Sequence, residues 1–176
     1  ATGAIIARQA TMLYQAAKGL VFDQGSPQPN PTPGVKLTSA PPLVGRVLLP
    51  LTGDPVASPM GWVINNETAG YNAIVGENVL GQQFITTVRR TVAPNGDFSF
   101  PLMLGPAAPS PVVFPDAANV NLFYWVNRAH DMFYRYGFDE AAGNFQLDNY
   151  GRGVAEGDPL VAYTHYGAAA TFSPSL

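Results

Sequence analysis

Cysteine is absent from this sequence of 176 residues. Neither a disulfide framework nor a thiolate metal site is therefore possible in this chain. Charge is scarce as well, because charged residues make up 12% of the chain, against about 25% in an ordinary soluble domain. Hydrophobic residues make up 47%, which is too many for a disordered tail. We therefore expect part of the apolar surface to lie against another chain or a missing part of a larger domain.

A basic patch is also lacking. The formal net charge is -3, and Arg89-Arg90 is the only adjacent basic pair, so the sequence gives no electrostatic basis for binding nucleic acid. A membrane-spanning segment is excluded too, because the longest uncharged stretch, residues 98–115, is repeatedly interrupted by proline. We interpret that stretch as an extended surface or partner-binding segment. Since Arg8 and Gln9 interrupt the first apolar run, we expect no signal peptide and a start like that of a processed product.

Histidine occurs twice, at His130 and His165. A hydrolytic zinc site on a helix typically uses H-E-x-x-H, in which two histidines one turn apart bind the metal and the glutamate activates water. That motif is absent, so we assign no catalytic and no metal-binding residue in this chain. We interpret His130 as a structural histidine bonded to a neighbouring loop. Five acidic residues fit no defined calcium loop and are interpreted as turn and capping groups: Asp139, Glu140, Asp148, Glu156 and Asp158.

The N-terminal third combines an apolar segment with a proline-rich one. Residues 4–18 carry apolar side chains at helical spacing and are followed by Gly19, which predicts a short amphipathic helix. Residues 24–59 contain nine of the seventeen prolines, which favours an extended linker or wrapping arm. We therefore assign residues 1–56 to a short helix plus a proline-rich arm, and residues 57–176 to a separate domain.

Short strands are expected in the next part of the chain, because β-branched and aromatic residues alternate with turn signals rich in Asn and Gly. The expected strands cover residues 62–64, 71–75, 84–92, 98–100 and, near the end, 160–166. We expect them to form small antiparallel sheets packed on one long central helix, an α+β fold. Asn66-Glu67-Thr68 is a formal N-glycosylation acceptor.

The long helix lies between a start signal at Pro115 and Asp116, with an N-cap candidate there, and a stop at Gly137. An apolar stripe at helical spacing is expected to face the core; its members are Leu122, Trp125, Val126, Ala129, Met132, Phe133 and Tyr136. The opposite, solvent-facing side is expected to hold Tyr124, Arg128, Asp131 and Arg135. Asp131 and Arg135 are spaced for an i,i+4 ion pair.

The helix opens the run NLFYWVNRAHDMFYRYGFDEAAGNFQLDNYGRG, residues 121–153, which continues to Gly157-Asp158-Pro159. This run closely resembles the secreted zinc metallopeptidases of the fungalysin family, whose catalytic domain is thermolysin-like. Upstream, Ala57-Ser58-Pro59 with Gly61-Trp62 looks like the entry into that domain. Gly76, Asn78 and Val79 look like the family's Gly-Asn-Asn-Val segment, with Glu77 as a departure. The resemblance covers about two thirds of the chain, from near Ala57 to Phe172.

The resemblance implies that residues 57–176 are the N-terminal part of a secreted zinc metalloendopeptidase domain. It also implies that the zinc-binding half is missing, that zinc is bound only with that half, and that the chain is inactive alone. The family's substrate-binding Asn-Asn-Ala edge strand corresponds here to Ala168, Ala169 and Ala170, and of these Ala170 alone agrees. A second interpretation is a non-catalytic structural or binding subunit, which keeps the scaffold and docks on a larger assembly through its first helix and proline-rich arm.

Overall fold

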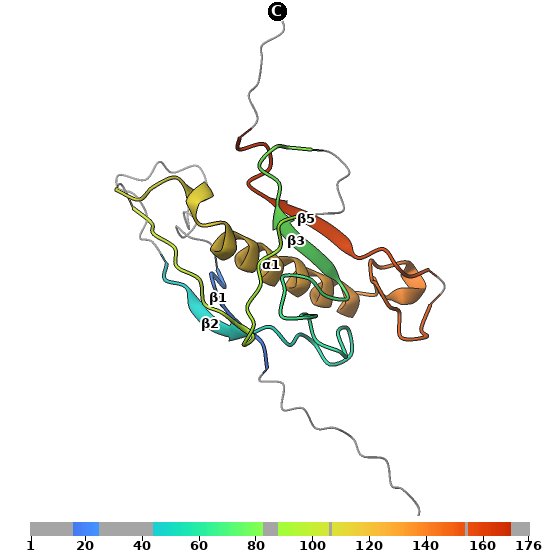
Figure 1. Cartoon of the computed structure of the whole chain (residues 1–176). Coiled ribbons are helices and arrows are strands. Elements are labelled where there is room, and N and C mark those ends of the chain that lie inside the picture. Colours follow the sequence, from blue (N-terminus) through green and yellow to red (C-terminus); the bar gives the residue numbers. More distant parts are fainter. Residues whose placement is uncertain (1–15, 25–43, 83–87, 106, 154, 170–176) are drawn as a thin grey trace, which may run out of the picture.

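One long helix and two small sheets make up the fold (Figure 1). The computed structural model describes residues 16–24, 44–82, 88–105, 107–153 and 155–169. In chain order the elements are β1 (Lys18–Val21), β2 (Val47–Pro50), β3 (Ala73–Glu77), β4 (Asp97–Phe98), η1 (Pro111–Val113), α1 (Pro115–Arg135), η2 (Glu140–Ala142) and β5 (Leu160–Thr164). The α+β class and the packing of small sheets on one long helix are therefore confirmed.

The two sheets differ in strand direction. The first sheet has the strand order β2-β1-β4. Strand β1 is antiparallel to β2, with Val21 opposite Val47, and it is parallel to β4. The second pairs β3 with β5 in parallel, starting with Ala73 opposite Leu160. The expectation of purely antiparallel sheets is therefore wrong. Because α1 lies between β3 and β5 in the chain, it carries the chain back across the sheet, and such a crossover produces a parallel pair.

Three expected strands correspond to observed ones, since residues 71–75, 98–100 and 160–166 overlap β3, β4 and β5. Residues 62–64 are irregular, and residues 88–92 make isolated bridges, Glu77 with Arg89 and Glu67 with Val92. Residues 83–87 lie outside the described part of the chain, as does most of the helix expected over residues 4–18. Strands β1 and β2 both come from the first 56 residues, where the sequence predicts no strand.

The bounds of α1 agree with the sequence signals. Pro115 occupies the first turn, and Gly137 adopts a φ of 94° two residues after the end. The expected cap at Asp116 is wrong, however, because Phe114 is the N-cap residue and makes no side-chain cap bond. Asp116 instead accepts a hydrogen bond from Thr91 Oγ1 (2.9 Å) and pairs with Arg89 (3.1 Å). The first turn of the helix is thereby attached to the segment that precedes it in the chain.

The expected orientation of α1 is wrong in part. Leu122 and Val126 pack against the core and Arg128 and Arg135 are exposed, as expected, but other positions are exchanged. Tyr124 and Asp131, expected in solvent, are buried, whereas Met132, Phe133 and Tyr136 of the apolar stripe are 48%, 52% and 83% exposed. Strands β1, β3 and β5 all contact the helix, and its buried side packs against them. That side is only partly apolar, and its buried polar groups make hydrogen bonds to loops. The spacing of apolar residues along the helix cannot predict such hydrogen bonds. Arg135 pairs with Asp54 rather than with Asp131.

The core lies between α1 and the sheets. Its buried members are Val21, Leu51, Trp62, Ala73, Val75, Ala93, Phe98, Val120, Phe123 and Tyr124. The residues of β1 and β3 alternate between buried and partly exposed positions, as in strands with one face on a core. Among the described residues, α1 included, no helix combines the length and apolar character needed to cross a bilayer.

A matched pair of phenylalanines tests the orientation of α1. Phe123 is fully buried and Phe133 is half exposed. We expect Phe123→Ala to lower the free energy of unfolding of this chain by about 3–5 kcal/mol, because it leaves a cavity. Phe133→Ala should change it by less than about 1 kcal/mol. Urea unfolding of both variants measures the difference, and a larger loss for Phe133→Ala would show that the helix faces the other way.

Candidate functional site

A buried carboxylate attaches the last turns of α1 to the loop that precedes β3. Asp131 Oδ2 accepts hydrogen bonds from the backbone N–H of Asp54 (2.7 Å) and from Trp62 Nε1 (2.9 Å). Asp131 Oδ1 accepts one from Ser58 Oγ (2.6 Å) and lies 3.0 Å from His130 Nδ1. Charge-assisted hydrogen bonds of this kind satisfy the carboxylate in a site that excludes water.

The network continues through amide side chains toward β3. Asn72 Nδ2 donates to Ser58 Oγ (2.9 Å) and to Asn127 Oδ1 (3.1 Å), and Asn127 Nδ2 donates to Phe123 O (2.8 Å). All these side chains are buried. The network therefore fixes the position of α1 relative to the start of β3 by directional bonds as well as by packing.

His130 is held by the same network. Its Nδ1 lies beside Asp131, its ring packs at 6.2 Å from the ring of Tyr134, and its side chain is 10% exposed. Its Nε2 is buried and has no hydrogen-bond partner among the described residues. The polar contact of His130 is thus with Asp131 on the same helix, and it is Asp131 that bonds the loop at residues 54–62.

A cleft of about 560 Å³ opens beside this network, between β2 and the second half of α1. Its wall includes Trp62, Tyr124 and Arg128. The Arg128 guanidinium lies 5.2 Å from the Trp125 ring and donates to the Tyr124 hydroxyl (2.7 Å). An arginine held over aromatic rings in this way offers its remaining N–H groups to an anionic group.

The end of α1 closes one side of the cleft with an ion pair. Arg135 donates through both Nε and Nη2 to Asp54 Oδ2. The hydrogen bond from Arg135, followed by those from the backbone N–H groups of Val56 and Ala57, lowers the pKa of Asp54 from 3.8 to about 2. Asp54 therefore stays ionised at all but strongly acidic pH.

The segment that the resemblance assigns to substrate follows β5. Among the described strands, β5 is hydrogen-bonded to β3. Beyond it, Ala168 N donates to His165 O (3.0 Å) and Ala169 N to Val79 O (2.8 Å), so the chain turns back toward the end of β3. Ala170, the substrate-binding residue expected from the sequence, lies outside the described residues.

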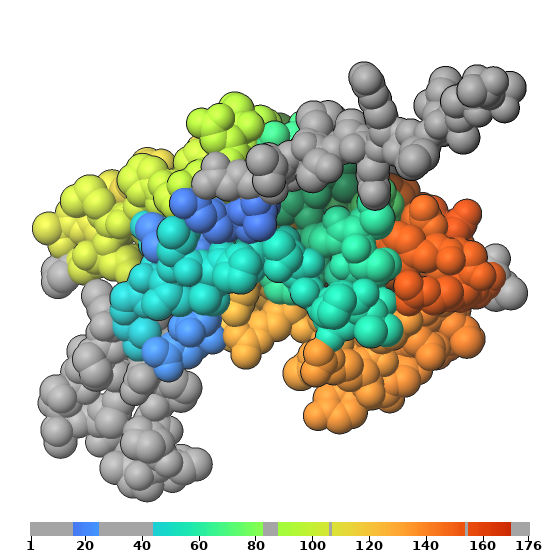
Figure 2. Space-filling model, turned by 90° about the horizontal axis from the view of Figure 1, so that it is seen from below, coloured from blue at the N-terminus to red at the C-terminus, as the bar shows by residue number. Residues whose placement is uncertain are grey.

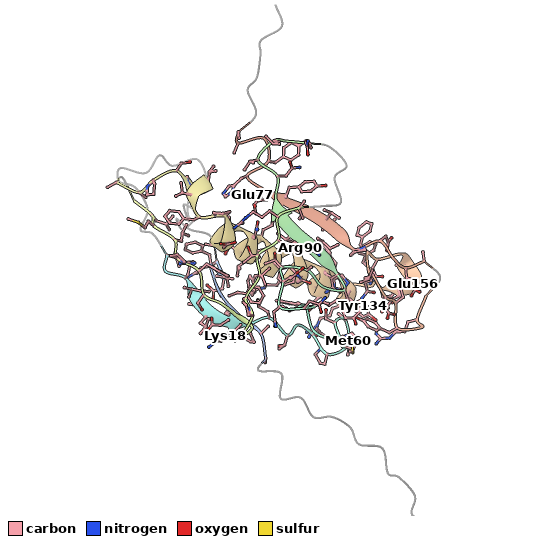
Figure 3. All side chains as sticks on the ribbon, viewed as in Figure 1. Lys18, Met60, Glu77, Arg90, Tyr134 and Glu156 are labelled. Carbon is pink, nitrogen blue, oxygen red and sulfur yellow. The ribbon has the colours of Figure 1, made fainter. Side chains whose placement is uncertain are left out.

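His165 lies at the exit of β5 and is engaged with β3. Its Nδ1 is 3.3 Å from Glu77 Oε1, and both side chains are about nine-tenths buried. Figure 3 shows Glu77 at the far end of β3 from Tyr134. Glu77 also faces Arg89 at 3.9 Å. The departure from the family pattern at Glu77 therefore has a local partner in His165, and the two residues hold β3 and β5 together at this end.

Four of the five acidic residues accept hydrogen bonds from backbone N–H groups in turns, as expected, whereas the expectation is wrong for Glu140. Asp139 accepts from the backbone N–H groups of Ala141 and Ala142, and Asp148 accepts from that of Tyr150. Glu156 and Asp158 accept from Asn149 N and Gln146 N. Glu140 is buried and binds the Tyr134 hydroxyl (2.8 Å) and Arg152. Burial, followed by the bond to Glu140, raises the pKa of Tyr134.

These residues do not make a metal site. Within the described ranges, no three His, Asp or Glu side chains gather as metal ligands do. His130 and His165 come from different elements, and each faces its own carboxylate. What sequence reasoning missed is the Asp131 network. The one available signal was Trp62, because a buried indole N–H needs an acceptor.

Comparison with known proteins gives a consistent set of matches. The family model described as Fungalysin metallopeptidase (M36) matches residues 38–173. The chain is 37% identical over 128 residues to "Extracellular metalloproteinase MEP" of Pyricularia oryzae, a match that covers 70% of this chain and 20% of that protein. It is 39% identical over 102 residues to "Extracellular metalloproteinase 3" of Trichophyton rubrum, a match that covers 55% of this chain and 16% of that protein. Among the most similar curated relatives, the matched part spans 13% to 26% of their length.

The Asp54–Arg135 pair predicts a dependence of stability on pH. Because the folded pKa of Asp54 is below its ordinary value of 3.8, the stabilisation is complete above about pH 4 and is lost as the pH falls toward about 2. Urea unfolding from about pH 5 to about pH 2 should therefore show a steeper loss of stability for the wild type than for Arg135→Ala. Arg128→Ala is the control, and parallel curves for all three proteins would contradict this assignment.

Proposed function

The chain belongs to the fungalysin family of metallopeptidases, and we propose that it is the N-terminal segment of the catalytic domain of a secreted zinc metalloendopeptidase. The observation that carries the proposal is the family match over residues 38–173. Relatives named as extracellular metalloproteinases support both the reaction class and the secreted location. The chain spans at most about a quarter of the length of those relatives, so the complete peptidase would be larger.

Zinc would be bound by the remaining part of that domain. The described residues of this chain do not fit the metal, because each histidine has a single carboxylate beside it and no group of three possible ligands gathers around either one. The proposed role of this segment is to complete the catalytic domain and to offer the chain that follows β5 to an extended peptide. The backbone of Ala170 would contribute there. The remaining half of the peptidase domain is the proposed partner.

One observation favours the second interpretation, a non-catalytic subunit on the same scaffold. Ala168 and Ala169 replace the amide side chains expected from the resemblance, and the Ala169 N–H is already bonded to Val79 O. A substrate strand would therefore find fewer donors here than in a peptidase with both amides. The two interpretations differ in activity, not in fold.

Metal content and activity of the full-length polypeptide that carries this chain test the proposal. We expect that polypeptide to bind zinc and to cleave an unstructured peptide, and both properties to disappear when a chelator removes the metal. The chain of 176 residues alone should show neither. Full-length protein that is folded but lacks zinc and activity would contradict the proposal and favour the non-catalytic subunit.

The secreted location gives Asn66 a testable role as a glycosylation site. Asn66 lies in a turn with a φ of 57°, is partly exposed, and donates through Nδ2 to Pro94 O (3.1 Å). Thr68, the third residue of the acceptor sequence, is buried and donates to Val75 O (2.8 Å). Since glycosylation uses the unfolded chain during secretion, burial of Thr68 after folding does not prevent it.

We expect expression in a eukaryotic secretory host to add one glycan to this segment, at Asn66. Asn66→Gln should remove the corresponding mass, as measured on the intact protein and after glycosidase treatment. The neighbouring Asn65→Gln is the matched control, because Asn65 lies in the same turn with a φ of 55° and begins no acceptor sequence. An unchanged mass for Asn66→Gln would show that the site is not used.

A further inference from the structure

Opposite its buried residues Phe123 and Asp131, α1 carries apolar side chains that the described residues cover only in part, since Leu122 packs against the core and Met132 lines the cleft beside β2. We call this surface the outer face and define it by Leu122, Trp125, Ala129, Met132, Phe133 and Tyr136. It contains no charged residue. Apart from Leu122, its large side chains, those of Trp125, Met132, Phe133 and Tyr136, are all exposed, with exposed fractions from 37% at Trp125 to 83% at Tyr136. In Figure 2 the light-orange atoms of the helix reach the surface on the lower side of the molecule, opposite the green segments.

The apolar surface extends beyond the helix at both ends. Beyond the last turn, Phe138 and Phe145 form an edge-to-face pair with ring centres 5.7 Å apart, and both are exposed. Toward the first turns the outer face joins a groove of about 530 Å³. That groove is lined largely by apolar side chains, among them Leu102, Leu104, Phe114, Ala118, Leu122 and Trp125. A continuous apolar surface of this length is typical of an interaction site.

We infer that the rest of the peptidase domain packs on the outer face of α1; this inference rests on the proposed function. A catalytic domain whose zinc ligands lie outside this chain must join its two parts through a permanent interface, and permanent interfaces resemble a hydrophobic core cut in half. The relatives supply the necessary length, since the matched part is 13% to 26% of their sequence. Of the described surface, the outer face combines apolar character with continuity.

The rim of this surface indicates the chemistry of the partner. Arg128 lies over the Trp125 ring and has no carboxylate within ion-pair distance in the part of the chain that the structure describes. Arg135, on the same border of the helix, has its guanidinium on Asp54 while remaining 73% exposed. The partner surface should therefore be aliphatic or aromatic at its centre and acidic where it meets Arg128.

Methionine oxidation distinguishes a covered outer face from an open one. Met132 belongs to the outer face and also lines the cleft beside β2, whereas Met60, labelled in Figure 3, lines a second cleft to which α1 contributes no residue. Both are exposed in this chain, 48% for Met132 and 63% for Met60. Oxidation by hydrogen peroxide follows exposure of the sulfur. The rates at both residues are measured by peptide mass spectrometry in the native full-length polypeptide and again in urea.

In the native full-length polypeptide we expect Met132 to be oxidised roughly ten-fold more slowly than in urea, while Met60 changes far less. Met132→Glu should lower the yield of secreted active enzyme several-fold, and Met60→Glu should not. Equal oxidation of both methionines in an active zinc enzyme would overturn the inference and leave the proposed function intact. Protection of Met132 only at concentrations at which the protein dimerises would also overturn it, by assigning the face to a second copy. Absence of zinc and activity would refute the proposed function, and the inference would fall with it.

Discussion

The structure depends on the Asp131 carboxylate. It lies on α1 and is bonded to the backbone of Asp54, to Ser58 and to Trp62, all from the loop before β3. Each hydrogen bond to a charged group contributes on the order of 1.5–3 kcal/mol, and the loss of one buried partner leaves the others unsatisfied. Since the same loop leads from β2 toward β3, this one carboxylate fixes the helix relative to both sheets.

That constraint explains why α1 turns its more polar side inward. Asn119, Asn127 and Asp131 are buried beside Val120 and Phe123. Asn119 donates to Arg89 O and to Thr91 Oγ1, and it accepts from Thr164 Oγ1. The segment at residues 89–91 and the end of β5 are therefore both hydrogen-bonded to one side chain of the helix. The apolar stripe is left on the opposite side, where nothing within the described residues covers it fully.

The sequence predicted the parts of the fold that local chemistry decides. Pro115 and Gly137 bracket α1 because proline suits a first turn and glycine adopts the positive φ after the last one. Asp139 and Asp148 cap turns for similarly local reasons. The facing of α1 and the parallel pairing of β3 with β5 were missed, because both depend on contacts between residues far apart in the chain. The Asp131 to Trp62 bond joins residues 69 positions apart, and no periodicity within the helix reports it.

The partly wrong orientation predicted for α1 is itself informative. Helical spacing located an apolar stripe, and low overall charge predicted apolar surface that the chain leaves uncovered; among the described residues, several apolar side chains of the stripe are exposed. The two signals concern the same residues, because Trp125, Met132, Phe133 and Tyr136 are the exposed ones. An amphipathic helix normally faces its apolar side to its own core. Helix α1 instead keeps a polar network inside, satisfied bond by bond, and presents apolar side chains outside. If the rest of the peptidase domain packs on the outer face, as we infer, α1 is an inner layer of a larger domain.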